Sequence, residues 1–313
     1  MKTRIGLIGS GYMASEYLKA SVAVENIQIV SIYSRNNDTA TLLASKFKIS
    51  KIAKSVEDFE NLGLDFLIVC VPELATTDII SSFSKLKLPL LVEKPVGLTF
   101  ADAIAIEKTA TTLGLPIFVA LNRRFYNSSL RVFKEMSLSA GRRFVRVNDQ
   151  ENTIAAIAAG QPEQVVNNWM FANSIHIIDF ISIVCRGEPL ITYKHIVPLD
   201  KDAYIIHASI QFSSGDEALY TCYWNSPAGW SVDINTATTA WQLSPLEIAR
   251  TRSLDERKYN DFGSDEFDLT FKPGLVRMLV ELEKCSNGKS HNLPTISDAN
   301  RTMRLIDLIY SND

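Results

Sequence analysis

The sequence predicts an α/β domain with a doubly wound parallel sheet, followed by a C-terminal domain of α+β character. Up to about residue 121, short β-branched or wholly apolar runs alternate with longer amphipathic stretches, which is typical of βαβ units. Beyond residue 122, closely spaced strand-like runs separated by turn sequences indicate a largely antiparallel sheet. A chain of 313 residues also exceeds the usual size of one hydrophobic core. We therefore expect domains at residues 1–121 and 122–313.

The elements expected in each domain follow from these periodicities. The first domain is predicted to contain strands at residues 4–8, 27–33, 64–71, 89–93 and 116–120, and helices at 11–22, 39–47, 74–86 and 99–113. The second is predicted to contain a helix at 172–185, strands at 190–197, 204–213, 217–225, 230–236 and 240–243, and two final helices at 272–286 and 297–311. Residues 66–71 are apolar throughout, as expected for a strand covered by helices on both faces.

Composition excludes several classes of function. The net charge of −3 does not suggest a nucleic-acid-binding surface, which needs clustered basic residues. The four cysteines are scattered singly, with no C-x-x-C pair, so we expect reduced thiols, no zinc or other metal site, and a cytoplasmic location. No apolar run approaches the roughly 18 residues that cross a bilayer, and no signal peptide is recognised. We expect neither a membrane nor a nucleic-acid partner.

A glycine-rich turn after the first predicted strand points to a nucleotide site. Residues 9–14 read G-x-G-x-x-A between that strand and the first helix. In this position Gly9 permits the tight turn, Gly11 lets the backbone approach a pyrophosphate, and Ala14 allows close packing of helix on strand. The helix N-terminus offers N–H groups to the phosphates. We therefore predict a Rossmann dinucleotide site, contacted at this turn by Gly9, Ser10, Gly11, Tyr12 and Met13.

The end of the second predicted strand indicates which dinucleotide is bound. An Asp or Glu there would bind the ribose 2′-hydroxyl of NAD, but this chain has Ser34 and Arg35. A hydroxyl and a guanidinium can both bind a 2′-phosphate, which a carboxylate would repel. NADP(H) is therefore favoured over NAD(H), although Ser34 or Asn36 could also serve NAD.

A second motif, Glu93-Lys94-Pro95 at the end of the strand predicted at 89–93, supports a resemblance to a known family. Together with the glycine-rich turn it resembles the Gfo/Idh/MocA family of glucose–fructose oxidoreductases and inositol dehydrogenases. Further resemblances are Val71-Pro72, residues 122–125 (Asn-Arg-Arg-Phe) and residues 174–179 (Ser-Ile-His-Ile-Ile-Asp). The resemblance extends over essentially the whole chain. It implies a Rossmann domain followed by a domain with an open, mostly antiparallel sheet that commonly forms the interface of a homodimer or homotetramer.

The same resemblance assigns roles to individual residues. Lys94 is expected beside the nicotinamide and the reacting carbon, where an ammonium can polarise a carbonyl or hydrogen-bond an alcohol. His176 matches a histidine that faces the substrate and can pass the accompanying proton. Val71, Pro72 and Glu93 are expected to line the cofactor, and Pro95 matches a position often preceded by a cis peptide.

The sequence also departs from the family pattern. Many members carry an aspartate four residues before the histidine and a glycine two residues before it, whereas this chain has Ala172 and Ser174. Asn173 cannot replace the missing carboxylate as an acid or base, because its amide does not titrate. The histidine that many members carry after Val-x-x-Pro is also absent. The proton step would then depend on Lys94, His176 or Tyr126.

Other polar residues are candidates for the substrate side. Arg123 and Arg124 can hold a polar or anionic group, although an ion pair or a solvated surface explains them equally well. Asp179 shares a helix face with His176 and either orients it or is an ordinary polar helix residue. Tyr126 and Asn173 are further candidates, with core packing the alternative for Tyr126.

The resemblance implies a hydride transfer to or from a secondary alcohol or ketone of a sugar, cyclitol or nucleotide-linked sugar. Two alternatives stay open. One is an imine or biliverdin-type reductase, because related folds host such activities. The other is a nucleotide-binding sensor without turnover, which Ala172 favours and which the retention of Lys94 and His176 opposes.

Overall fold

The computed structural model describes residues 2–199 and 203–311 of the chain. Contacts between Cα atoms divide it into two compact units. The first unit comprises Met1–Phe125 and Phe267–Asn300, and the second comprises Tyr126–Glu266 and Arg301–Asp313. The junction after Phe125 lies four residues beyond the predicted end of the first domain at residue 121. Residues 267–300 differ from the predicted division, because they return to the first unit.

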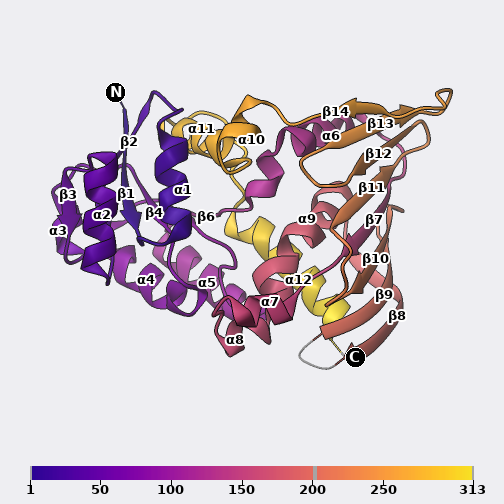
Figure 1. Cartoon of the computed structure of the whole chain (residues 1–313), viewed down its shortest axis with the longest axis horizontal. Helices are drawn as coiled ribbons and strands as arrows, with labels where there is room; N and C mark the ends of the chain where they lie inside the picture. The colour runs from indigo at the N-terminus through magenta and orange to yellow at the C-terminus, as the bar shows by residue number, and fades with distance from the viewer. Residues whose placement is uncertain (1, 200–202, 312–313) are drawn as a thin grey trace. The chain divides into compact units, whose positions relative to one another are not determined.

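The first unit is built on a six-stranded parallel sheet with the order β3-β2-β1-β4-β5-β6, which confirms the predicted doubly wound fold (Figure 1). Its strands are β1 (Thr3–Ile8), β2 (Ile27–Tyr33), β3 (Lys51–Ala53), β4 (Phe66–Val69), β5 (Leu90–Val92) and β6 (Ile117–Val119). Its helices include α1 (Tyr12–Ser21), α2 (Asn37–Phe47), α3 (Glu57–Glu60), α4 (Thr76–Phe83), α5 (Phe100–Leu113) and α11 (Leu275–Ser286). The short β3 and α3 were not predicted, because three or four residues give no readable period.

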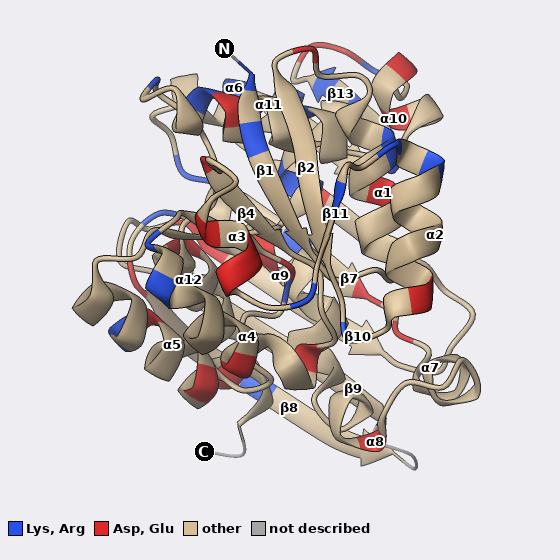
Figure 2. Ribbon diagram, turned by 90° about the vertical axis from the view of Figure 1, so that its left-hand side faces the viewer, with Lys and Arg blue, Asp and Glu red and all other residues tan. Residues whose placement is uncertain are grey.

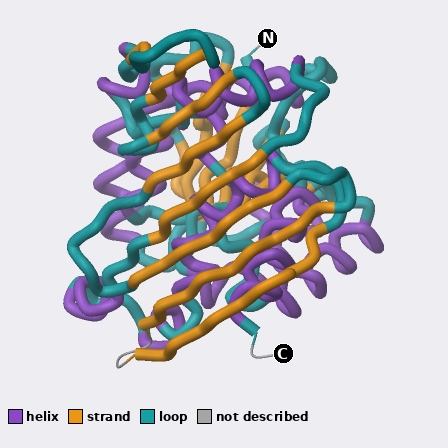
Figure 3. Tube along the Cα trace, turned by 90° about the vertical axis from the view of Figure 1, so that its right-hand side faces the viewer, coloured by secondary structure: helices purple, strands orange, loops and turns teal. Residues whose placement is uncertain are grey.

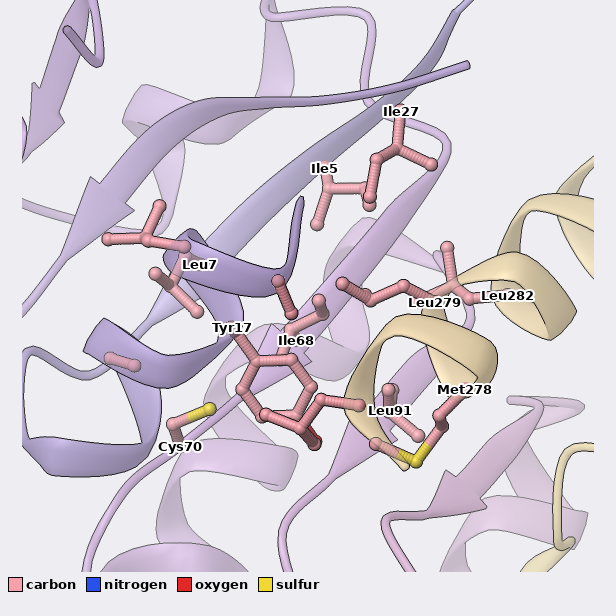
Figure 4. Close-up of a cluster of buried hydrophobic side chains, with 14 of the residues drawn as sticks. Ile5, Leu7, Tyr17, Ile27, Ile68, Cys70, Leu91, Met278, Leu279 and Leu282 are labelled. Atoms are coloured by element: carbon pink, nitrogen blue, oxygen red, sulfur yellow. The ribbon is translucent and has the colours of Figure 1, made fainter. Parts of the chain in front are cut away.

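Helix α11 completes the core of the first unit from a distant part of the sequence. Leu279 and Leu282 on α11 are fully buried and lie with Ile5 of β1 and Tyr17 of α1 in one hydrophobic cluster (Figure 4). The apolar side of the helix predicted at 272–286 therefore packs on the parallel sheet. Burial of such side chains contributes about 1.5 to 3 kcal/mol each, which explains why residues 267–300 return to this unit.

Charged side chains on the helices of the first unit are of both signs. Three of the four residues of α3 are acidic, and Lys85 forms an ion pair with Glu57 of that helix (Figure 2). This mixed surface differs from the clustered basic surface that a nucleic-acid backbone requires. Among the residues that the structure describes, no helix has both the length and the apolar character needed to span a membrane.

The second unit is built on an eight-stranded sheet with the order β14-β13-β12-β11-β7-β10-β9-β8 (Figure 3). Its strands are β7 (Phe144–Asp149), β8 (Pro189–Leu199), β9 (Ala203–Phe212), β10 (Glu217–Tyr223), β11 (Ser231–Asn235), β12 (Thr239–Leu243), β13 (Ala249–Ser253) and β14 (Asn260–Phe262). Only β10 and β7 pair in parallel, and the other neighbours are antiparallel, which confirms the predicted sheet type. Strands β7, β13 and β14 were not predicted.

One face of this sheet is covered by helices and the other by none among the described residues (Figure 1). The helices of the unit are α6 (Asn127–Leu138), α7 (Thr153–Ala158), α8 (Glu163–Val166), α9 (Ile175–Val184) and α12 (Ile296–Tyr310), the last of which begins in the first unit. Residues of β7, β9 and β10 alternate between buried and exposed with the period of a strand. The covered face is therefore the core of this unit.

A buried aspartate fixes the turn between β9 and β10. Asp216 is fully buried and accepts hydrogen bonds from the backbone N–H groups of Arg143 (3.0 Å) and Arg186 (2.9 Å). The Arg186 guanidinium also donates to both carboxylate oxygens, at 2.8 and 2.7 Å. Although burial opposes ionisation, these donors hold the pKa of Asp216 well below its usual range. The charged form of Asp216 therefore stabilises the folded state.

We predict that Asp216→Asn lowers the free energy of unfolding at pH 7 by about 3 kcal/mol, because it leaves Arg186 without its buried partner. A depressed folded pKa gives stability that is present above the unfolded value, about 4, and is lost at lower pH. The difference between variant and wild type, measured by urea unfolding, should shrink as the pH falls below 4. Asp261→Asn, which removes an exposed ion pair with Arg250, should cost less than about 1 kcal/mol. Equal losses in the two variants would contradict this role.

Candidate functional site

The predicted cofactor residues lie together at the carboxyl edge of the parallel sheet. Gly9 follows β1, Ser34 follows β2, Val71 follows β4 and Glu93 follows β5, and these four strands are neighbours in the sheet. Backbone hydrogen bonds tie these segments together, from Gly9 N–H to the Tyr33 carbonyl (2.8 Å) and from Glu93 N–H to the Val69 carbonyl (2.9 Å). Strand β1 is also where the chain turns from one side of the sheet to the other. Ligands of doubly wound sheets bind at such a point.

Gly9 cannot carry a side chain in this turn. Its φ of +112° lies in a region that side chains disfavour, and a Cβ atom would lie 2.0 Å from the Cys70 carbonyl oxygen. The loop after β1 therefore passes directly against the loop after β4. This contact fixes how closely the loops after β1 and β4 approach each other.

The first turn of α1 is left open for an anion. Gly11, the N-cap residue, has no side chain that could accept a hydrogen bond from the first N–H groups, and no acidic residue occupies the first turn of α1. By contrast, Asn36 caps α2 and Thr99 caps α5 through their own side chains. A Cβ on Gly11 would meet nothing within 4 Å, so the space over this glycine is open. The N–H groups at the start of α1 can therefore bind a phosphate group.

Hydroxyl groups line the neighbouring loop. Ser10 Oγ donates to Ser34 Oγ (2.7 Å) and lies 2.5 Å from Thr39 Oγ1. Arg35 is exposed beside this hydroxyl cluster, and the Asn36 side chain is engaged as the cap of α2. Ser34 and Arg35 together can donate hydrogen bonds to a 2′-phosphate. Asn36 is less available for a ribose contact than the sequence suggested.

Glu93, the acid of the Glu-Lys-Pro motif, is half-buried and accepts a hydrogen bond from a buried tyrosine. Tyr17, 1% exposed on α1, donates its hydroxyl proton to Glu93 Oε1 at 2.9 Å. Desolvation raises the pKa of Glu93, while Lys94, Tyr17 and Lys272 oppose the shift. The Lys94–Pro95 peptide is cis, as the resemblance suggested. Lys94 is half-buried, and its ammonium is electrostatically coupled to the Glu93 carboxyl group.

Lys272 is a candidate site residue that the sequence analysis missed. Its Nζ lies 5.3 Å from the centre of the Tyr12 ring at the start of α1, and its charge also acts on Glu93. The loop that carries it is anchored within the same unit by Asn122 Nδ2, which donates to the Pro273 carbonyl at 3.0 Å. An isolated lysine 260 residues beyond the glycine-rich turn gives no local signal. Only the return of residues 267–300 to this unit brings it to the carboxyl edge.

The remaining predicted residues of the first unit are half-buried or exposed, and they lie in loops and turns that follow strands of the parallel sheet. Val71 is partly buried and Pro72 is exposed after β4. Arg123 and Arg124 are half-buried in the short turn at residues 122–125, where Arg123 Nη1 lies 3.5 Å from Asn122 Oδ1. Neither arginine is a purely solvated residue. Their assignment to a substrate stays a proposal.

In the second unit, the predicted residues lie on or beside α9. His176 is 4% exposed in the first turn of α9, directly after a π-helical stretch at Met170–Ser174. Such π-helical turns are frequent at functional sites. The imidazole ring lies 6.5 Å from the Trp230 ring, centre to centre. Tyr126, 4% exposed at the start of α6, is buried as the packing alternative supposed.

Asp179 and Asn173 have partners inside the second unit. Thr302 of α12 donates its hydroxyl proton to Asp179 Oδ1 at 2.7 Å, and both residues are buried. Asn173 Nδ2 donates to both oxygens of the Glu151 carboxylate, at 3.1 and 2.9 Å. These contacts favour structural roles, since they hold α9 against α12 and against the loop after β7.

Two buried carboxyl groups at the end of β7 also escaped the sequence analysis. Asp149 is fully buried and Glu151 is 5% exposed. Glu151 accepts from Trp169 Nε1 at 2.8 Å, in addition to Asn173. The alternation of Val145, Val147 and Asp149 on one face was the available signal, but β7 itself was not predicted.

Taken separately, the two units offer complementary chemistry. The first provides an anion-binding helix start, a hydroxyl and guanidinium pair, and an ammonium on Lys94. The second provides a buried imidazole on His176 and carboxyl groups near its helix. An ammonium can polarise an oxygen and an imidazole can exchange a proton near neutral pH.

Comparisons with known proteins agree with the geometry of the first unit. Residues 3–121 match the Gfo/Idh/MocA family model, which describes an oxidoreductase family with an NAD-binding Rossmann fold. The solved structure of a dehydrogenase from Chromobacterium violaceum superposes with a TM-score of 0.84 at 18% identity, covering 100% of this chain and 96% of that one. This likeness confirms the fold of the whole chain.

Two curated relatives match part of the chain. One is 4-carboxy-2-hydroxymuconate-6-semialdehyde dehydrogenase of Sphingobium sp. strain SYK-6, 23% identical over 184 residues, which cover 57% of this chain and 58% of that protein. The other is glucose-6-phosphate 3-dehydrogenase of Bacillus subtilis, 26% identical over 139 residues, which cover 44% of this chain and 38% of that protein. The aligned regions therefore span less than two thirds of either relative.

The two glycines of the turn should respond differently to the same substitution. We predict that Gly9→Ala lowers the free energy of unfolding by about 3 kcal/mol or more, through its positive φ and its contact with Cys70. Gly11→Ala should change stability by less than about 1 kcal/mol, because its Cβ meets open space. It should nevertheless weaken nicotinamide dinucleotide binding by roughly tenfold or more, because the methyl group obstructs the pyrophosphate. Thermal unfolding and fluorescence titration measure the two effects, and unchanged binding by Gly11→Ala would contradict the site.

Proposed function

We propose that the chain is an NAD(P)-dependent dehydrogenase or reductase of the Gfo/Idh/MocA oxidoreductase family, whose NAD-binding Rossmann-fold model matches residues 3–121. The substrate would be a secondary alcohol or the corresponding ketone of a sugar, cyclitol or nucleotide-linked sugar. The observation that supports this proposal most is the carboxyl edge of the first unit. There an uncapped helix start, two facing hydroxyl groups and Lys94 follow neighbouring strands.

In this proposal the dinucleotide is held by backbone groups and a few side chains. Gly9, Ser10, Gly11, Tyr12 and Met13 would surround the pyrophosphate, and Lys272 would add a positive charge beside Tyr12. Val71, Pro72 and Glu93 would line the dinucleotide farther along the carboxyl edge of the sheet. When bound, the nicotinamide ring supplies or accepts the hydride.

The protein residues would handle the charge and the proton. The Lys94 ammonium would hydrogen-bond the reacting oxygen and stabilise the negative charge that develops on it. His176 would take the hydroxyl proton during oxidation and return it during reduction. Arg123 and Arg124 would hold polar groups of the substrate. The name of one curated relative, glucose-6-phosphate 3-dehydrogenase, supports a sugar substrate, whereas the name of the other gives a semialdehyde.

We also propose that the sheet face of the second unit, which no described helix covers, contacts a second copy of the chain. Strand β8, at one edge of this sheet, carries exposed apolar side chains, including Leu190 (64% exposed) and Tyr193 (59% exposed). Burial of such residues favours association of like subunits. A homodimer or homotetramer is the expected assembly.

Cofactor preference follows from Ser34 and Arg35. We predict that NADPH binds at least about tenfold more tightly than NADH, since a charge-assisted pair with the 2′-phosphate contributes about 1.4 kcal/mol or more. Arg35→Ala should remove this difference, whereas Lys108→Ala, at an exposed position of α5, should keep it. Nicotinamide fluorescence titration measures both affinities. Equal binding of NADPH and NADH by the wild type would contradict the preference and leave the dinucleotide site in place.

Turnover depends on Lys94 in this account. We predict that Lys94→Ala lowers kcat by roughly 10³-fold and leaves the Kd for NADPH within about threefold, because the ammonium acts on the reacting oxygen. Single-wavelength assays over a panel of sugars, cyclitols, nucleotide sugars and their ketones measure kcat. Tight NADPH binding by the wild type without turnover on any of them would favour the alternative of a nucleotide-binding sensor, which Ala172 already suggests.

A further inference from the structure

A buried carboxyl group lies at the centre of the second unit, and no role has yet been assigned to it. Asp149 is the last residue of β7 and is fully buried on the covered face of the sheet. Burial of a charged group in such a place lowers the stability of the fold unless the group is paired, so its presence requires an explanation. Tyr220 of β10, also fully buried, donates its hydroxyl proton to Asp149 Oδ2 at 2.5 Å.

A chain of hydroxyl groups leads outward from Asp149. The Tyr220 hydroxyl lies 2.7 Å from the hydroxyl of Tyr310 in the last turn of α12. Tyr310 is only partly buried, in contrast to Tyr220 and Asp149. The three side chains therefore form a hydrogen-bonded series from a fully buried acid to Tyr310, which as a residue is partly exposed at the end of α12. Such a chain can transfer a proton by successive exchange along its hydrogen bonds.

Asp149 can titrate near neutral pH. Burial raises the pKa of Asp149 to about 6, although Ser174, Tyr220, Trp230 and Trp224 favour its ionised form. The other groups of the cluster stay protonated at pH 7, because burial raises the pKa of Tyr220 and Tyr310 and raises that of Cys222 to about 12. Glu151, in the loop after β7, acts on Tyr310 of this cluster, and His176 lies on the neighbouring segment of chain that follows Ser174. Asp149 is therefore an acid of this cluster whose charge changes near pH 6.

Two side chains connect Asp149 with His176. The Trp230 side chain acts on the Asp149 carboxyl group, and its ring lies 6.5 Å from the imidazole of His176. Ser174 acts on the same carboxyl group and lies two residues before His176 on the continuous helix. All of these residues belong to the second unit. A negative charge in this poorly solvated region favours the protonated form of a nearby imidazole.

We propose that Asp149 is a positioning residue that sets the proton affinity of His176, and that it exchanges its own proton with solvent through Tyr220 and Tyr310. In the uptake direction a solvent proton adds to the Tyr310 oxygen, the Tyr310 proton passes to Tyr220, and the Tyr220 proton passes to the carboxylate. The role of His176 in the reaction rests on the proposed function. The electrostatic coupling of Asp149 to His176 does not depend on turnover.

The test is an NMR titration of the histidine Cε1 protons in the full-length protein between pH 5 and 9. His176→Gln identifies the signal, since the chain has four histidines. Asp149→Asn keeps the shape of the side chain and removes its charge, so it should lower the pKa of His176 by at least about one unit, a tenfold change in its acid dissociation constant. The matched control is Asp233→Asn on β11, which removes the same charge from a partly exposed position and should shift His176 by less than about 0.3 unit.

An unchanged His176 titration in Asp149→Asn, or an equal shift in Asp233→Asn, would overturn the proposal. If Asp149→Asn does not fold, Tyr220→Phe replaces it, since loss of the donated hydrogen bond makes Asp149 ionise at higher pH. His176 should then shift in the same direction by a smaller amount, and no shift would again overturn the coupling. NADPH titration and turnover of the same samples separately test the proposed function. Where turnover is measured, the pH profile of kcat should move with the His176 pKa.

Discussion

The approach of Gly9 to the carbonyl group of Cys70 is the constraint on which the carboxyl edge depends. A positive φ and a missing side chain let the loop after β1 pass against the loop after β4. This passage leaves α1 to begin at once, with its first N–H groups uncapped at the edge of the sheet. The anion site is therefore a property of the backbone. The side chains of Ser34, Arg35 and Lys94 are placed around it because their strands end at the same edge.

Much of the first unit could be predicted because its signals are local. A strand, a glycine-rich turn and a helix follow one another within about twenty residues, and each restricts the conformation of the next. The wholly apolar β4 could be recognised for the same reason, since burial on both faces removes the need for alternation. The capping box from Thr99 to Asp102 was likewise readable as the start of α5.

The parts that could not be predicted depend on contacts between distant residues. Nothing near Lys272 indicates that α11 packs on α1, because the amphipathic pattern of a helix identifies a buried face and not its partner. Strand β7 was missed because it is short and carries polar residues at alternate positions, including a buried aspartate. The hydrogen-bond partners of Asp149 and Glu151 are Tyr220, Trp169 and Asn173, which lie 18 to 71 residues away in the sequence. Local sequence patterns therefore give no sign of these contacts. Fold class was thus accessible from sequence patterns, and the polar core of the second unit was not.

The central claim is that the carboxyl edge of the first unit binds a nicotinamide dinucleotide through the start of α1. A crystal structure of the protein grown with NADPH tests it most directly. The account predicts the pyrophosphate against the backbone N–H groups of residues 10–12, and the 2′-phosphate beside Ser34 and Arg35. NADPH bound elsewhere on the chain, or a pyrophosphate away from the start of α1, would contradict the account.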